Sequence, residues 1–446
     1  MHQHSSPSQY RHTIFLLIVV IALVNYIDRG AIAYAAGQIT AEYGFDRAGW
    51  GSVLGYFGYG YMFGALIGGA LADRLGAKRV WVIAGIAWSL FAIGMIWAGD
   101  LGIALFGGSA LSGFAMVRIL FGFSEGPAYS IINKTMSAWA PPAERGFAVS
   151  IGLLSTPLGA LITAPVAVGL LLLTDSWRSM YVVLGGLGLV LITLFARLYT
   201  NRPEDHPKVN AGELASIRAG RAEAATAMSQ VQPALPWWAF FRSRTLVFNS
   251  IGYFSFIYVN FMLLTWTPKY LHDQFHFTLS SLWYVGMIPW VGACFTVLLG
   301  GRISDWLHKR TGKLVIARSW FAAGSLLLTT LCFLLVSQAQ SVWAVIALMT
   351  LGNALNALPN SVYWAVVIDT APSRVGTFSG IMHFIANIAA VLAPTLAGIL
   401  SARYGYSSMF IATAVATAVG VFAMLQVRPG VGSRVEAKAS AVVAAE

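Results

Sequence analysis

Long apolar stretches alternate with short polar segments along almost the whole chain. A helix that crosses the hydrocarbon core of a bilayer needs about 20 apolar residues. A window of that length predicts twelve such helices, six before and six after one long polar stretch. Their predicted bounds are 13–36, 48–71, 78–98, 103–131, 147–172, 179–199, 246–269, 279–301, 315–336, 341–366, 376–402 and 407–427. We therefore predict an all-α membrane protein with twelve transmembrane helices in two six-helix halves.

The polar stretch between the sixth and seventh predicted helices divides the chain. The predicted parts are a tail at 1–12, an N-terminal half at 13–199, a linker at 200–245, a C-terminal half at 246–427 and a second tail at 428–446. The first tail lacks the short apolar core and small-residue cleavage site of a secretory signal. We expect it to be retained.

Composition and charge support a membrane protein. The chain is 57% hydrophobic and 10% charged, whereas soluble domains carry about 25% charged residues. Of 28 Lys and Arg residues, 22 fall on the side of the membrane that holds both tails and 4 on the other. This predicts cytoplasmic termini. The charge of +11 is therefore explained by topology, and we expect no nucleic-acid partner.

A short internal repeat relates the two predicted halves. "GGALADRLGAKR" ends the second predicted helix and "GGRISDWLHKRTGK" ends the eighth, so Gly-Gly, Asp and basic residues recur at equivalent loops. Repeated halves of membrane transporters enclose a site near the middle of the bilayer and rock about it. The repeat therefore favours a transporter.

Five further motifs occur in the order that one transporter family has them. They are "NYIDR", "RILFGFSEGP", "WAPPAERG", "TWTPKYL" and "DTAPSRVG". Together with the repeated loop, they resemble the anion:cation symporter family of the major facilitator superfamily over nearly the whole chain. Within that family the chain is similar to bacterial galactonate, glucarate and hexuronate transporters. The resemblance implies uptake of an organic anion together with protons.

Four ionisable residues fall inside the predicted helices: Asp28, Arg29, Arg118 and Glu125. Such residues are costly in a bilayer unless they are paired or face water, so they are functional candidates. Arg118 and Glu125 are seven residues apart and share a helix face. Asp28 and Arg29 diverge by about 100° around their helix, so we expect one to face a cavity and the other a neighbouring helix.

The charges of these residues suggest their roles. A guanidinium group forks onto a carboxylate, which suits Arg29 or Arg118 for substrate recognition. A carboxyl group in a poorly solvated cavity can exchange protons near neutral pH, which suits Asp28 and Glu125. The resemblance implies the same coupling residues and places the substrate carboxylate on Arg29. The alternative is a pair of internal salt bridges that only hold helices together.

Polar and aromatic residues on other helices would complete a substrate pocket. The predicted ones are Tyr61, Thr156, Asn260, Asn360, Trp364, His383 and Asn387. The resemblance places Thr156 where galactonate transporters have glutamine and His383 where they have asparagine, which leaves the substrate open. Polar residues in transmembrane helices also form interhelical hydrogen bonds without any substrate role.

Three loop residues have a possible gating role: Asp73, Arg74 and Asp305. The resemblance implies that Asp73 bonds a helix end when the transporter faces outward. The alternative is plain solvation of charged loops.

The leading hypothesis is proton-coupled uptake of a small organic anion, such as a hexonate or hexuronate. We expect a monomer in a bacterial inner membrane, with a small anion, protons and lipid as its partners. Trp364, Tyr61 and Tyr363 keep an aromatic or dicarboxylic acid open as the substrate, and a drug/proton antiporter is a further alternative. The sequence has no metal-ligand cluster, nucleophile motif or nucleotide loop, so we expect no enzyme, metal or cofactor. Cys294 and Cys332 both fall in predicted helices, and we expect no disulfide.

Overall fold

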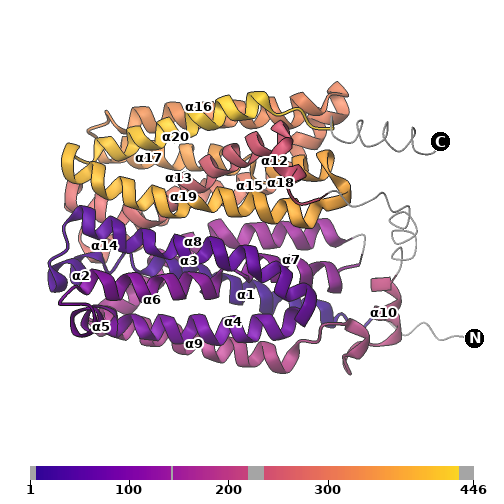
Figure 1. The fold of residues 1–446 in the computed structure, drawn as a ribbon, viewed down its shortest axis with the longest axis horizontal. Helices are drawn as coiled ribbons and strands as arrows, with labels where there is room; N and C mark the ends of the chain where they lie inside the picture. The colour runs from indigo at the N-terminus through magenta and orange to yellow at the C-terminus, as the bar shows by residue number, and fades with distance from the viewer. Residues whose placement is uncertain (1–6, 142–143, 219–235, 431–446) are drawn as a thin grey trace, which may run out of the picture.

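The computed structural model describes residues 7–141, 144–218 and 236–430. Within these ranges every regular element is helical. Long helices lie side by side in one elongated bundle (Figure 1). One end of the bundle carries α10 (Ala211–Arg218) and α12 (Ala239–Arg242), and we call it the linker end. The other end carries α2 (Ala36–Tyr43) and is called the opposite end.

The first group of helices precedes the linker and is drawn in indigo to magenta in Figure 1. Besides α2, its elements are α1 (Tyr10–Ala31), α3 (Arg47–Leu75), α4 (Ala77–Gly94), η1 (Met95–Trp97), α5 (Ala98–Leu105), α6 (Ala110–Glu125), α7 (Ala128–Trp139), α8 (Arg145–Thr174) and α9 (Trp177–Leu198).

The linker contributes η3 (Pro203–Asp205), α10 and α12. The second group is drawn in rose through orange to yellow on the other side of the bundle (Figure 1). Its elements are α13 (Arg244–Phe275), α14 (Leu279–Val285), α15 (Ile288–Thr311), η4 (Val315–Trp320), α16 (Phe321–Val336), α17 (Val342–Ala357), α18 (Asn360–Thr370), η5 (Pro372–Arg374), α19 (Val375–Tyr404) and α20 (Ser407–Gln426).

Ten helical segments of the described chain are long and apolar enough to cross a membrane. Two more, α3 and the α6–α7 pair, are less apolar, and they pack beside α19 and α4 respectively. With these two, the described residues hold twelve long segments, which confirms the predicted all-α membrane fold. The assignment of 13–199 and 246–427 as domains stays a prediction.

The predicted start of the fourth segment, residue 103, is wrong. The helix before it resumes after η1 and continues through α5 to Leu105. Gly107 and Gly108 then take positive φ values of 63° and 86°, which glycine tolerates because it has no Cβ. The Ser109 side chain accepts a hydrogen bond from the backbone N–H of Ser112 and caps α6. A hydrophobicity window hides this turn, because apolar residues on both sides of Gly107, Gly108 and Ser109 merge into one run.

Breaks in two segments position residues of the site. Pro127 follows Glu125 between α6 and α7, and Pro359 precedes Asn360 between α17 and α18. Proline removes a backbone donor and clashes with the preceding turn, so it interrupts a helix. Glu125 and Asn360 therefore lie at helix ends inside the bundle.

Glycines let α3 pack closely against a helix of each group. A Cβ on Gly60 would lie 1.8 Å from the carbonyl oxygen of Ile119 in α6. A Cβ on Gly51 would lie 2.8 Å from Cα of Gly398 in α19. Side chains are excluded from both contacts, so α3 joins the two groups through backbone-to-backbone packing.

The start of α1 is capped by a residue far away in the sequence. The N-cap residue, Gln9, makes no side-chain cap bond. Instead, the buried Glu213 carboxylate of α10 accepts hydrogen bonds from the backbone N–H groups of Tyr10 and Arg11, both at 2.9 Å, and from the Ser8 hydroxyl. Arg11 also pairs with Glu213 at 3.3 Å and with Glu144 at 3.0 Å. These hydrogen bonds and ion pairs hold α10 of the linker against the start of α1.

Glu213→Gln is expected to destabilise the folded protein by about 1–3 kcal/mol at neutral pH, because it weakens hydrogen bonds to a buried charge. Burial alone would raise the pKa of Glu213, but the hydrogen bonds from Ser8, Arg11 and Tyr10 lower it. A carboxyl with a lowered pKa stabilises the fold above its ordinary pKa, and the stabilisation is lost as the pH falls through the folded value. Thermal unfolding in detergent should therefore show a difference at pH 7 that shrinks on acidification.

The matched control is Glu204→Gln, because the Glu204 ion pair with Arg218 is long, at 3.8 Å, and partly exposed. Equal unfolding temperatures for wild type and Glu213→Gln at pH 7 would contradict the capping role.

Candidate functional site

A small cavity of about 40 Å³ lies in the middle of the bundle between the two groups of helices. Of the nine residues predicted to bind substrate, eight line it. They are Arg29, Tyr61, Thr156, Asn260, Asn360, Trp364, His383 and Asn387. Binding pockets for small ligands usually measure about 300–1,000 Å³, so this central cavity is contracted in the structure.

Arg29 of α1 is the charged side chain in the lining of the central cavity. It is buried, and its Nε and Nη2 atoms donate to Glu125 Oε2 at 3.1 and 2.9 Å. Its guanidinium carbon also lies 4.3 Å from the ring centroid of Tyr61 and 4.9 Å from that of Phe57. Carboxylate and aromatic faces are the two surfaces that a guanidinium group binds best. The surroundings thus hold Arg29 in one orientation.

The two predicted carboxyl groups have different surroundings. Glu125 pairs with Arg29 through Oε2, while its Oε1 has no hydrogen-bond partner among the described residues. Asp28 is fully buried and outside the lining of the central cavity, and neither of its oxygens has a partner within the described ranges. Its polar neighbour is the indole of Trp88 on α4. Asp28 and Arg29 therefore face different ways, as their angular separation requires.

Arg118 is the predicted substrate residue that lies outside the central cavity. It is buried, it donates from Nη2 to the carbonyl oxygen of Leu54 at 3.2 Å, and it lies 5.4 Å from the ring of Phe57. The ring of Phe57 also contacts Arg29, so it lies beside both cations. The sequence places Arg118 on the same helix face as Glu125, but that spacing does not show that the ring of Phe57 packs beside Arg118.

The second group of helices supplies neutral polar atoms to the central cavity. Asn360 Oδ1, Trp364 Nε1 and both ring nitrogens of His383 lack partners among the residues that the structure describes. Asn260 donates to Phe256 O at 2.9 Å and Asn387 to His383 O at 2.7 Å, each within its own helix. The cavity is therefore cationic on one wall and offers free neutral donors and acceptors on the other.

Aromatic residues that sequence reasoning missed complete the lining. They are Tyr26, Tyr129, Tyr253, Phe256 and Phe261. Tyr253, Phe256 and Asn260 follow an i, i+3, i+7 spacing on α13, which marks one helix face and could have identified them. Tyr363 was expected near the pocket, but its ring packs 5.2 Å from that of Tyr253 outside the lining.

Access to the central cavity differs between the two ends of the bundle. Tyr129, Trp364 and His383 line both the cavity and a cleft of about 470 Å³ that extends to Asp73 near the linker end. Towards the opposite end, α3 and α19 pack together, and Arg47 donates to the carbonyl oxygen of Ser401 at 3.1 Å. The three shared side chains thus separate the cavity from a cleft at the linker end.

The predicted gating residues lie near the linker end, but their assignment to loops is wrong: Asp73 and Arg74 belong to the last turn of α3, and Asp305 lies within α15. Asp73 pairs with Lys134 of α7 at 2.8 Å, and Asp305 pairs with Arg318 of η4 at 3.0 Å. Arg74 is exposed and makes no ion pair with any described residue. Each pair stays within one group of helices, and the gating roles stay predictions.

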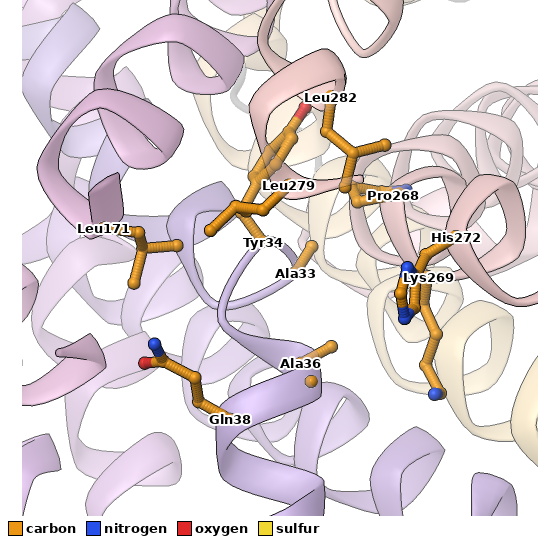
Figure 2. Close-up of a pocket in the computed structure, with 11 residues that line it drawn as sticks. Ala33, Tyr34, Ala36, Gln38, Leu171, Pro268, Lys269, His272, Leu279 and Leu282 are labelled. Carbon is orange, nitrogen blue, oxygen red and sulfur yellow. The ribbon is translucent and has the colours of Figure 1, made fainter. Parts of the chain in front are cut away.

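A separate pocket of about 230 Å³ lies near the opposite end (Figure 2). Figure 2 shows Pro268, Lys269 and His272 of α13 on one side of it, with Gln38 and Ala36 of α2 below. Lys269 pairs with Asp273 at 3.0 Å. No predicted site residue lines this pocket.

The described residues contain no cluster of His, Cys, Asp or Glu side chains suited to binding a metal ion.

A family model described as Major Facilitator Superfamily matches residues 18–394 and, in a second match, 312–444. The chain belongs to the major facilitator superfamily. The predicted fold of twelve helices and the prediction of a transporter instead of an enzyme are thereby confirmed. The chain is accordingly a multi-pass membrane protein.

Several curated members of the superfamily are similar to this chain over most of their length. The hexuronate transporter of Bacillus subtilis is 28% identical, with 94% of this chain and 95% of the relative covered. The probable sulfoacetate transporter SauU of Cupriavidus necator is 31% identical, with 94% of each covered. The probable galactarate/D-glucarate transporter GudP of Escherichia coli is 29% identical, with 89% and 88% covered. The predicted resemblance to sugar-acid transporters is confirmed.

A solved structure shares the fold. A bacterial homologue of the human lysosomal transporter Spinster, in an inward-facing and unoccupied conformation, aligns with a TM-score of 0.70. It is 17% identical, with 94% of this chain and 97% of that chain covered. At this identity the likeness supports the superfamily fold alone.

Proposed function

We propose that the protein is a proton-coupled symporter that takes up a small organic anion, most simply a sugar acid such as a hexuronate. The observation that carries the proposal is the pairing of Arg29 with Glu125 at the edge of the central cavity. Arg29 is the cation of that lining, and its counter-ion is a group that a proton can neutralise. The sugar-acid transporters among the similar proteins support the same substrate class.

The Arg29–Glu125 pair links proton binding to anion binding. While Glu125 is ionised, its Oε2 occupies the Nε and Nη2 donors of Arg29. When a proton neutralises Glu125, those donors become free to bind a substrate carboxylate. One proton and one carboxylate then bind together. The net charge of Arg29, Glu125 and the substrate carboxylate stays at zero, so no buried charge is left uncompensated. Asp28 is proposed as a second proton-carrying group.

The remaining residues of the central cavity are proposed to bind the rest of the substrate. Asn360, Trp364 and His383 offer unpaired polar atoms opposite Arg29. Asn260 and Asn387 complete that wall, and Thr156 of α8 lies on the same side as Arg29. These groups suit the hydroxyls of a sugar acid. Tyr61 is proposed to hold Arg29 in place by its ring.

Alternating access is proposed as the transport mechanism. The central cavity lies between the two groups of helices, closed towards the opposite end and adjoining a cleft at the linker end. We place the linker end in the cytoplasm of a bacterial inner membrane, because Lys and Arg concentrate on that side. The protein is proposed to act as a monomer, with Asp73, Arg74 and Asp305 as gating residues.

An aromatic or dicarboxylic acid is the second candidate substrate. Tyr26, Tyr129, Tyr253 and Phe256 give the central cavity flat apolar walls, and an aromatic ring would stack on them. A drug/proton antiporter is disfavoured, because Arg29 would repel a cationic drug and already compensates Glu125.

The test of this proposal is uptake into proteoliposomes under an imposed pH gradient, with the interior alkaline. The panel contains radiolabelled glucuronate, galactarate, galactonate, sulfoacetate, phthalate and 4-hydroxyphenylacetate. We expect gradient-driven accumulation of at least one sugar acid. Accumulation of aromatic acids alone would establish the second candidate, and failure of every acid to move would refute the symporter.

A further inference from the structure

The first group of helices contains a cluster of buried polar side chains that are only partly satisfied. Each has at least one buried polar atom without a hydrogen-bond partner among the residues that the structure describes. The members are Asn25, Asp28, Trp88, Arg118, Glu125 and Tyr181. All six are at least nine-tenths buried. We call them the buried polar cluster.

The buried polar cluster belongs to α1, α4, α6 and α9, of which α9 packs against α1 and α4, and α4 packs against α6. Their labels lie together in the lower half of Figure 1, away from the second group of helices. The Tyr181 hydroxyl on α9 is within electrostatic range of Asp28, Arg118 and Glu125. None of Asp28, Trp88, Arg118 and Tyr181 lines the central cavity. The cluster is thus a second polar region, behind the substrate cavity.

The donors and acceptors of the buried polar cluster fit bound water. Arg118 has free donors, Glu125 has a free acceptor, the Trp88 N–H lies beside the Asp28 carboxyl, and the Tyr181 hydroxyl can both donate and accept. Buried polar atoms are nearly always hydrogen-bonded to protein or to ordered water, because leaving them unpaired costs free energy. Internal waters are stable where two to four polar partners surround them, and this cluster provides such partners.

Glu125 connects this region to the central cavity. Its Oε2 accepts both hydrogen bonds from Arg29, and its Oε1 has no partner within the described ranges. One oxygen is thus committed to the substrate residue and the other is free for a different partner. A proton could therefore reach Glu125 without passing through the substrate.

We propose that the buried polar cluster holds water and that Tyr181 relays protons between Asp28 and Glu125 through it. The inference rests on the proposed proton coupling. In each transfer the Tyr181 hydroxyl accepts a proton from one water and donates its own to another, so its protonation state is unchanged afterwards. Tyr181 is a positioning and relay residue, since it touches neither the anion nor Arg29. Protons and substrate then reach Glu125 by different routes.

The test compares Tyr181→Phe with Tyr363→Phe in proteoliposomes that contain the substrate found with the panel. Tyr363 is a matched control, because its hydroxyl is also buried without a described partner but lies in the other group of helices. Two rates are measured for each variant, namely substrate counterflow without a gradient and accumulation driven by a pH gradient. Proton influx is followed with a trapped pH-sensitive dye.

Tyr181→Phe is expected to slow gradient-driven accumulation and proton influx by about 100-fold or more, the lower end of what a proton-transfer group contributes, while counterflow stays within about twofold of wild type. Trp88→Phe, which removes the N–H beside Asp28, should give the same split in weaker form. Wild-type accumulation in both variants would overturn the relay, and so would equal loss of accumulation and counterflow in folded protein. Wild-type protein that carries the anion without protons would refute the proposed coupling and the relay together.

Discussion

Glu125→Gln abolishes accumulation driven by a pH gradient while counterflow exchange continues. Glutamine has the shape of the protonated acid but cannot release a proton, so Arg29 stays available to the substrate in both orientations of the transporter. A gradient of one pH unit is worth about 1.4 kcal/mol, or roughly tenfold accumulation for one coupled proton. In Glu125→Gln the ratio of substrate concentration inside to that outside should fall to about 1, because the pH gradient no longer drives uptake.

The control for this variant is Glu42→Gln. Glu42 pairs with Arg178 at 2.6 Å near the opposite end, remote from the central cavity. The Glu42→Gln variant should accumulate substrate as the wild type does. Normal accumulation in Glu125→Gln would remove Glu125 from the coupling role and leave Asp28 as the candidate.

Arg29→Lys is expected to weaken substrate binding by about 2–3 kcal/mol, or roughly 30- to 150-fold in Kd, the value of hydrogen bonds to a charged group. Lysine keeps the charge beside Glu125 but loses the planar fork and the stacking on Tyr61. Because lysine keeps the positive charge, Glu125 is not left as an unpaired buried carboxylate. The change in affinity therefore reports the lost contacts between the guanidinium group and the substrate. Titration calorimetry with purified protein measures the change.

Arg178→Lys serves as the comparison for Arg29→Lys, because Arg178 is half exposed and pairs with Glu42 outside the cavity. Unchanged affinity in Arg29→Lys would show that the substrate carboxylate binds elsewhere.

Much of the candidate site could be predicted from the sequence. The residues were found because charged and polar side chains are rare in membrane-length apolar runs, so each one stands out. Arg29 and Asn360 are examples, and the structure brings both to one central cavity although they come from different groups of helices. The resemblance to sugar-acid symporters added Tyr61 and Trp364, which composition alone does not distinguish from packing residues.

The remaining features depend on contacts that have no local signal. Phe57, which lies beside both Arg29 and Arg118, is an ordinary aromatic residue in a glycine-rich helix. The free oxygen of Glu125 and the unpartnered hydroxyl of Tyr181 become visible only once α9 is packed against α1 and α4. The turn at Gly107 does have a local signal, the Gly-Gly dipeptide followed by Ser109, but the apolar residues on both sides of it were counted as one run. Tertiary packing therefore decides which polar groups face the substrate and which face each other.

The central claim is that the anion and the proton move together. It is tested most directly by adding the anion identified with the panel to proteoliposomes that contain wild-type protein and a trapped pH-sensitive dye, without an imposed gradient. We predict that the interior acidifies as the anion enters, and that Glu125→Gln admits the anion with no acidification. Anion entry into wild-type vesicles with no change of internal pH would contradict it.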